Sequence, residues 1–239
     1  MPANVFIAAL REMTLPETTE RLNRIEMRHG DLFAEAGDAI DRVVFPMSGM
    51  ISIVTRLEDG DAVEAAMVGP SGALGMAALF GPAIHINTAF CQIPGEACTL
   101  PIGVFQQAAD ANPRLRALAL AQEQYILAQS QQAAACNARH QLSARMATWL
   151  LRAADEVDND GLKLTQEYLA TMLGVQRTSL CMAAGQFQER NLINVRRGRI
   201  NLLDRTALEG QACECYRSLR AQYRRLNPQH DVQVRVAAG

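Results

Sequence analysis

One segment of this 239-residue chain, residues 164–180, carries polar side chains at a spacing suited to reading another molecule. Thr165 is typical of a helix N-cap, and Gly174 is typical of the tight turn that ends a helix. We therefore predict a short helix, a turn at Gly174 and a second helix over about residues 176–190, which together form a helix-turn-helix. The start of such a second helix enters the DNA major groove, where side chains read base edges. The candidate DNA-contacting residues here are Thr165, Gln166, Gln176, Arg177, Thr178, Ser179 and Met182.

The apolar spacing in the same segment predicts which side chains face the core. The first helix directs Tyr168, Leu169 and Met172 inward, and Val175 fills the space between the two helices. The inward residues predicted for the second helix are Leu180, Ala183, Ala184 and Phe187.

A basic hairpin follows the two helices. Residues 192–204 predict two short strands around Arg197-Gly198, and the tip carries Arg196, Arg197 and Arg199. A wing of this kind, beside a helix-turn-helix, is placed to hold backbone phosphates. The alternative interpretation is a structural helical hairpin with a solvated run of charge.

A long helix precedes this unit. Asn112 and Pro113 are typical of a helix start, and nothing interrupts the helical pattern over residues 114–136. A helix of this length beside a small β-domain has a face left to bury, so we predict pairing with a second copy. An ordinary packing helix is the alternative, because several core positions are Gln. The candidate dimerisation residues are Leu115, Leu118, Tyr125, Ile126 and Ala133.

The sequence pattern before the long helix is typical of a β-domain. Gly and Asp punctuate short apolar segments from residue 30 to about residue 100, which predicts an all-β sandwich or barrel of roughly seventy residues. Within it, residues 50–55 and 62–68 predict a hairpin. Short helices are expected over residues 5–28.

Composition limits the function classes. The chain is 49% hydrophobic with no apolar run of membrane length, so we expect a cytoplasmic globular protein without a membrane partner. Residues 1–136 carry a net charge of −7 and residues 137–239 a net charge of +5, and a basic unit of this kind suits phosphate. We find no paired carboxylates, nucleophile elbow or phosphate-binding Gly loop, so an enzyme is not predicted.

The cysteines show no disulfide or metal pattern along the chain. Six Cys are scattered, as expected of reduced thiols, and residues 1–30 contain none. Cys213-x-Cys215 has no second pair nearby in sequence, so we interpret it as buried packing. No metal, haem or other cofactor is predicted.

Three segments, residues 30–38, 169–179 and 197–200, carry a resemblance to a known family. The sequence resembles the Crp/Fnr family of bacterial transcription regulators. The resemblance implies an α+β protein, with an N-terminal double-stranded β-helix (a cupin-like jelly roll of the cyclic-nucleotide-binding type), a long dimerisation helix and a C-terminal winged helix-turn-helix. The expected domains are residues 1–110, 111–137 and 138–239. The resemblance further implies a homodimer on an inverted-repeat DNA site that contacts RNA polymerase.

The nucleotide pocket departs from the family pattern. Cyclic-AMP binders of the family pair a Glu with the ribose hydroxyl and an Arg with the cyclic phosphate. Here Met76 stands at the Glu position and His85 lies near the Arg position. Because a phosphate buried without a cation carries a large desolvation cost, we predict no cyclic-AMP response. The weak pocket candidates are Gly72, Gly75, Met76 and His85, and the effector stays unknown.

The recognition helix departs as well. Thr178 stands where the best-known members have a Glu, and Met182 where they have a second Arg. Arg177 can still read guanine through its forked donors, while Thr178 or Met182 can touch a thymine methyl. We therefore expect a different preferred sequence within an inverted repeat, with the two recognition helices about 34 Å apart.

Overall fold

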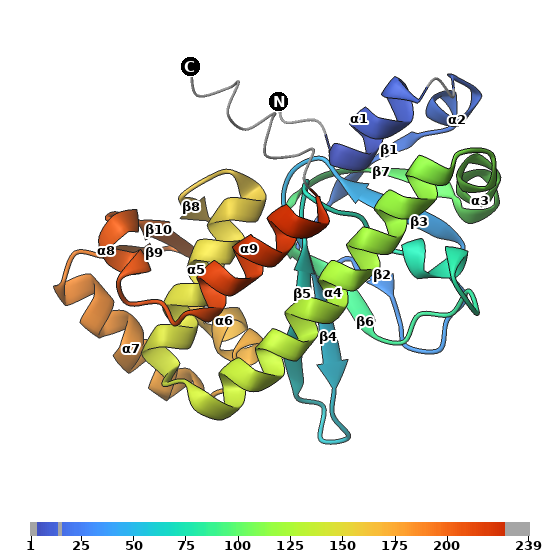
Figure 1. The fold of residues 1–239 in the computed structure, drawn as a ribbon. Coiled ribbons are helices and arrows are strands. Elements are labelled where there is room, and N and C mark those ends of the chain that lie inside the picture. Colours follow the sequence, from blue (N-terminus) through green and yellow to red (C-terminus); the bar gives the residue numbers. More distant parts are fainter. Residues whose placement is uncertain (1–3, 14–15, 228–239) are drawn as a thin grey trace, which may run out of the picture.

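The computed structural model describes residues 4–13 and 16–227. Residues 1–3 and 14–15 of the expected domain 1–110, and residues 228–239 of the expected domain 138–239, lie outside the described residues. The N-terminal half folds into two antiparallel sheets that face each other as a β-roll (Figure 1). One sheet has the order β1-β7-β3 and the other the order β2-β6-β4-β5. The strands are β1 Asn23–Met27, β2 Leu32–Ala34, β3 Arg42–Pro46, β4 Met50–Arg56, β5 Ala62–Val68, β6 Thr88–Ile93 and β7 Gly95–Pro101.

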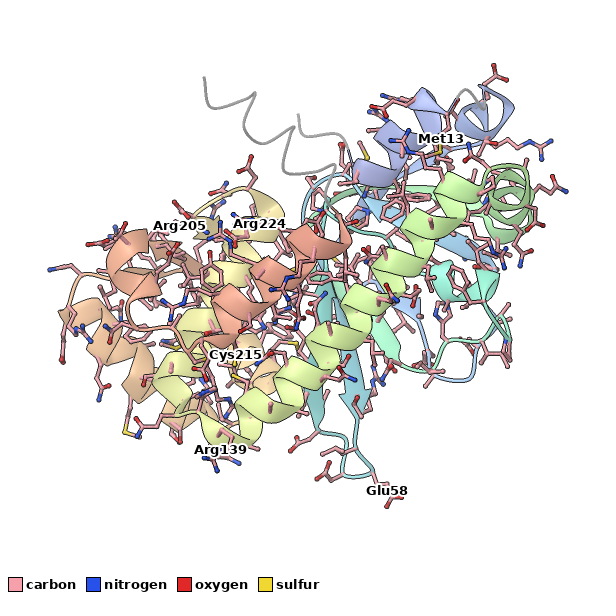
Figure 2. All side chains as sticks on the ribbon, in the orientation of Figure 1. Met13, Glu58, Arg139, Arg205, Cys215 and Arg224 are labelled. Atoms are coloured by element: carbon pink, nitrogen blue, oxygen red, sulfur yellow. The ribbon has the colours of Figure 1, made fainter. Side chains whose placement is uncertain are left out.

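The predicted hairpin is confirmed as β4 and β5. Its register pairs Ile51 with Val68 and Arg56 with Ala62, and the turn contains Gly60 at φ +90°. The hairpin extends from the β-roll beyond α4, and Figure 2 shows Glu58 at its tip. One end of β5 lies against the C-terminal domain, because Val63 is next to Gly174.

The prediction of helices through residue 28 is wrong in its last part. Helices α1 Val5–Glu12 and α2 Pro16–Glu20 do form, but Asn23–Met27 is strand β1. This strand pairs with β7, from Asn23 opposite Thr99 to Met27 opposite Gly95. Pairing with a distant strand overrides the local helical preference, and Met27 is buried in the β-roll core.

The predicted long helix is confirmed as α4, Pro113–Arg139, which follows α3, Ile102–Ala111. The Asn112 side chain caps it by accepting hydrogen bonds from the backbone N–H groups of Arg114 and Leu115. The helix runs diagonally across the molecule, from the β-roll to the start of the C-terminal domain (Figure 1). It ends at His140, whose extended backbone (φ −105°, ψ 147°) turns the chain into α5.

The C-terminal domain is a winged helix-turn-helix, so the expected α+β arrangement is confirmed. A three-stranded sheet of order β8-β10-β9 closes one side of it. Its core continues into the β-roll, because Trp149 and Leu169 belong to the same hydrophobic cluster as Met50 and Met67. The elements are α5 Leu142–Val157, β8 Gly161–Leu162, α6 Gln166–Met172, α7 Arg177–Glu189, β9 Ile193–Arg196, β10 Arg199–Leu202, α8 Arg205–Glu209 and α9 Cys215–Leu226.

In the part of the chain that the structure describes, no helix combines the length and the apolar character needed to cross a membrane.

Candidate nucleic-acid interface

The turn between α6 and α7 is built by local hydrogen bonds. The Thr165 hydroxyl accepts from the backbone N–H of Tyr168 at 3.3 Å, which caps α6 as predicted. Gly174 takes φ +62°, and the backbone N–H of Val175 then donates to the Ala170 carbonyl at 3.0 Å. This geometry ends α6 and directs the chain into α7 within a few residues.

Helix α7 separates an apolar inner face from a polar start. All four predicted inward residues are buried in the main core. At the outer end, the Arg177 side chain is 68% exposed and Met182 is 67% exposed, while Thr178 is exposed and Ser179 half-buried. Gln176 is exposed at the N-cap position and makes no capping bond with its side chain. The first turn of α7 therefore presents side chains and backbone N–H groups to an external partner.

An exposed acid lies beside the central arginine. Glu167 of α6 is 3.9 Å from the Arg177 guanidinium, and both side chains are more than two-thirds exposed. An exposed pair of this kind contributes about 0–1 kcal/mol, so it leaves Arg177 available to another acceptor.

The wing is confirmed as the β9–β10 hairpin. Arg196 pairs with Arg199, and the two turn residues, Arg197 and Gly198, have φ +47° and φ +74°. Two positive φ values suit the tight turn that joins twisted antiparallel strands. All three arginines are exposed, so the tip concentrates positive charge.

The wing and the two helices form one surface. The Gln188 side chain of α7 accepts a hydrogen bond from the backbone N–H of Val195 at 3.0 Å, which holds β9 against the helix. The wing turn also lies next to Thr165, since a Cβ at Gly198 would be 3.9 Å from the Thr165 methyl. Gln166 is half-buried and accepts from the Cys181 thiol at 3.5 Å, so it also joins α6 to α7.

Tyr168 is not an inner residue of α6, and that prediction is wrong. It is 41% exposed, and its ring meets the His29 ring of the β-roll edge-on, with centroids 4.2 Å apart. His29 is positioned in turn by a hydrogen bond between its Nδ1 and the Gln92 carbonyl at 2.9 Å. Tyr168 therefore contributes a contact between the two domains rather than to the core of the helix-turn-helix.

Two arginines that the sequence analysis did not identify link the elements of the C-terminal domain to one another. Arg145 of α5 donates to the Leu173 carbonyl at the end of α6. Arg205 of α8 contacts Asp155, lies 3.0 Å from the Asp160 carboxylate and donates to the Tyr216 hydroxyl at 3.2 Å. No local sequence signal identifies these partners, because each comes from a different element.

Three of the four weak pocket candidates are buried, and His85 is half-buried. Met76 is fully buried in the same core cluster as Phe45, and Gly75 makes a left-handed turn at φ +98°. The Gln122 side chain of α4 covers Gly72 so closely that a Cβ there would be 2.6 Å from its Nε2. Burial lowers the pKa of His85, which disfavours the cation that a phosphate needs.

The candidate dimerisation residues lie on the inner or lateral faces of α4. Leu115 and Tyr125 are buried in their own chain, and Tyr125 stacks edge-on with Tyr223 of α9 at 5.0 Å. Leu118 and Ile126 pack against β-roll clusters, and Ala133 is half-buried. Leu115 and Tyr125 are therefore occupied within their own chain, and a dimerisation role for these five residues stays a prediction.

A buried carboxyl group joins the β-roll to the C-terminal domain. Glu64 of β5 accepts hydrogen bonds from the Ser52 hydroxyl and, at 2.7 Å, from the Trp149 indole N–H of α5. Removal from water raises its pKa to about 7, although these bonds and the nearby Arg152 act in the opposite direction.

Cys213 and Cys215 are buried, as the packing interpretation predicts. Cys136 and His140, distant in sequence, lie beside them, and the four potential ligand atoms are all within 4.8 Å of one another. These residues could hold a metal ion.

Comparison with known proteins agrees with this architecture. Residues 144–210 match the Crp-like helix-turn-helix domain, and residues 24–112 match the cyclic nucleotide-binding domain. The chain is a Crp/Fnr-type transcription regulator. It is thus related to regulators and not to enzymes.

Relatives of this regulator are distant in sequence but similar in fold. It is 23% identical over 176 residues to the global nitrogen regulator of Nostoc sp. strain PCC 7120, covering 70% of this chain and 78% of that protein. The structure of FixK2 from Bradyrhizobium japonicum superposes with a TM-score of 0.69 at 17% identity, covering 80% of this chain and 98% of that one. A CRP-family regulator from Thermus thermophilus gives a TM-score of 0.64 at 24% identity, covering 80% and 96%.

Proposed function

We propose that this Crp/Fnr-type regulator binds an inverted-repeat DNA site as a homodimer, with α7 in the major groove and the wing arginines on phosphates. The observation that supports this most strongly is the exposed polar start of α7 beside an arginine-rich wing held against the same helix. A structural helical hairpin needs neither feature.

Within the proposed complex, each exposed residue has a separate role. Arg177 donates two hydrogen bonds to a guanine edge, and Thr178 or Met182 contacts a thymine methyl. Arg196, Arg197 and Arg199 neutralise phosphates and fix the register without reading sequence. Thr165 lies beside the wing turn and caps α6, which places it at the edge of the same proposed surface.

The second copy has a suitable surface on α4. A stripe of exposed residues repeats at alternating intervals of four and three, which is the spacing of a two-stranded coiled coil. Two leucines on it, Leu120 and Leu127, are 46% and 57% exposed. We call this stripe the α4 seam, and its residues are Ala117, Leu120, Gln124, Leu127, Gln131, Ala134 and Ala138.

We also propose that cyclic AMP is not the signal. The loop that would hold its phosphate contains a buried methionine, and Gln122 covers the adjacent glycine. His85 is the candidate cation, and its pKa is shifted by burial toward the neutral form. A phosphate placed there would be desolvated without compensation.

Selection of bound duplexes from random DNA tests the proposal, using purified protein without added ligand. The expected result is an enriched inverted repeat whose half-sites are about one helical turn apart, and loss of the enrichment in Arg177→Ala. Added cyclic AMP is expected to change neither the enriched sequence nor the amount bound.

Two outcomes contradict the proposal. Salt-sensitive binding to every duplex without enrichment shows that the interface holds phosphates but does not read bases. A repeat that persists unchanged in Arg177→Ala shows that α7 is not the reading helix.

A further inference from the structure

Two segments far apart in sequence meet at the bend between the long helix and the C-terminal domain. Cys136 lies in the last turn of α4 and His140 at its C-cap, while Cys213 and Cys215 lie just before and at the start of α9. Figure 2 shows Cys215 where α9 faces α4. The four potential ligand atoms, three sulfurs and one imidazole nitrogen, all lie within 4.8 Å of one another.

The distances between the potential ligand atoms fit one metal ion. The sulfurs of Cys136 and Cys213 are 3.5 Å apart, and the sulfur of Cys215 is 3.5 Å from Nδ1 of His140. Around tetrahedral zinc, bond lengths of about 2.3 Å to sulfur and 2.0–2.1 Å to nitrogen place ligand atoms about 3.5–3.8 Å apart. Small side-chain movements thus suffice to surround an ion.

We propose that Cys136, His140, Cys213 and Cys215 bind one zinc ion in a closed tetrahedral site. Three thiolates and one imidazole form a donor set that suits zinc in structural positions. An iron–sulfur cluster stands between its cysteine ligands and needs them farther apart than these four atoms lie. Because all four positions are filled by the protein, the site has no place for a substrate.

The surrounding groups orient the ligands as a metal site requires. The Glu214 carboxylate is 3.2 Å from Nε2 of His140, which leaves Nδ1 facing the sulfurs. A carboxylate behind a ligating histidine fixes its ring and its tautomer. The Gln132 amide donates to the sulfur of Cys215 at 3.0 Å, and the Thr148 hydroxyl lies 3.1 Å from the sulfur of Cys213. These polar groups stabilise thiolates that would otherwise carry uncompensated charge.

The burial of the cluster favours retention of the ion. All three cysteines are buried, and Ala144 of α5 packs against them. His140 is the more accessible ligand, with 22% of its side chain exposed, and it provides a route of entry.

A zinc ion here would join the long helix to the last helix of the DNA-binding domain. The chain bends at His140, so the angle between α4 and α5 sets where α7 lies relative to the α4 seam. This consequence rests on the proposed dimer, in which a site that ties α4 to α9 at this bend holds the two recognition helices in place relative to the α4 seam.

Metal analysis of the full-length protein tests the site. Protein expressed with added zinc and passed through gel filtration is expected to retain about one zinc ion per chain. Cys213→Ser and Cys136→Ser are expected to lose it. Cys181→Ser is the matched control, because Cys181 lies on α7 outside the cluster, and it is expected to retain zinc.

A second readout does not depend on the folding of any variant. Wild-type protein stripped of metal and titrated with cobalt(II) is expected to develop thiolate-to-cobalt charge-transfer bands and the strong visible bands of tetrahedral cobalt. The absence of these bands from folded wild-type protein overturns the proposal. Equal zinc content in wild type and Cys213→Ser also overturns it. The same holds if the protein contains stoichiometric iron with sulfide, or if a Cys136–Cys213 disulfide forms in a reducing buffer that contains zinc.

Discussion

The glycine-containing loop of the β-roll and the start of α7 are both places where relatives of this fold can meet a ligand, yet their residues face opposite ways. In the loop, Met76 is fully buried and Gln122 covers Gly72. At the start of α7, Met182 is 67% exposed and Arg177 has only a weak, solvated partner. Side chains of the protein itself fill the space at the loop, whereas the start of α7 is exposed to solvent.

This contrast shows that two regions of one fold can differ fully in exposure. The loop turns through the left-handed Gly75, and its apolar side chains pack into the core. The helix start keeps exposed hydrogen-bonding groups that an external partner can reach. Function therefore follows exposure and charge at each site rather than the topology that positions it.

The largest expected effect comes from substituting the two methionines that represent these regions. Met76→Ala removes a fully buried side chain and should lower the free energy of unfolding by about 2–5 kcal/mol. Met182→Ala, the matched control, should change it by less than about 0.5 kcal/mol, because its side chain is mostly exposed. Urea unfolding of both variants measures the difference. Similar losses would show that the loop is not packed as described.

The second prediction concerns Glu64, the buried carboxyl group that joins the β-roll to the C-terminal domain. Between about pH 4.5 and pH 7, the folded protein keeps a proton on Glu64 that the unfolded chain releases, since burial raises its pKa to about 7. The unfolding free energy should therefore fall with rising pH across this window, by roughly 3 kcal/mol at most from this group. Glu64→Gln should remove this contribution.

The pH effect is measured as a difference between the two proteins. Glu123, whose pKa burial also raises to about 7, and Glu156, whose pKa burial raises, give slopes of the same sign in both. Urea unfolding at about pH 5 and about pH 8 therefore compares wild type with Glu64→Gln under equal background. Identical pH dependence in the two proteins would contradict the assignment to Glu64.

The proposed α4 seam gives a smaller but distinctive effect. Leu127→Glu places a charge from each copy in the contact and should weaken dimerisation by at least about tenfold, or about 1.4 kcal/mol. Leu32→Glu is the matched control, because Leu32 is similarly exposed on β2, away from α4. Sedimentation at several concentrations measures the dissociation constant. Equal dimerisation of both variants would place the dimer contact elsewhere.

Local signals predicted several elements of the fold correctly. The β4–β5 hairpin, α4, the Gly174 turn and the wing follow from turn residues, caps and short-range periodicity, which act within a few residues. Strand β1 was missed because its partner, β7, lies some seventy residues away.

The contacts between distant elements could not be predicted from the sequence. Helix α4 carries two stripes with the same heptad spacing, and only the packed structure shows that Leu115 faces inward and Leu127 outward. Tyr168 has the spacing of a core residue, but its neighbour is His29 of the other domain. The cluster around Cys136 and Cys213 combines residues 77 positions apart, so no spacing motif reveals it.

The most direct test of sequence-specific binding compares two arginines on two duplexes. Affinities of wild type, Arg177→Ala and Arg199→Ala are measured for the selected inverted repeat and for a scrambled duplex, over a range of salt. Arg177→Ala should reduce discrimination between the duplexes by about 1–3 kcal/mol. Arg199→Ala should weaken both duplexes similarly and lower the salt dependence. If both variants lose the same affinity on both duplexes, α7 does not read the sequence and the account is contradicted.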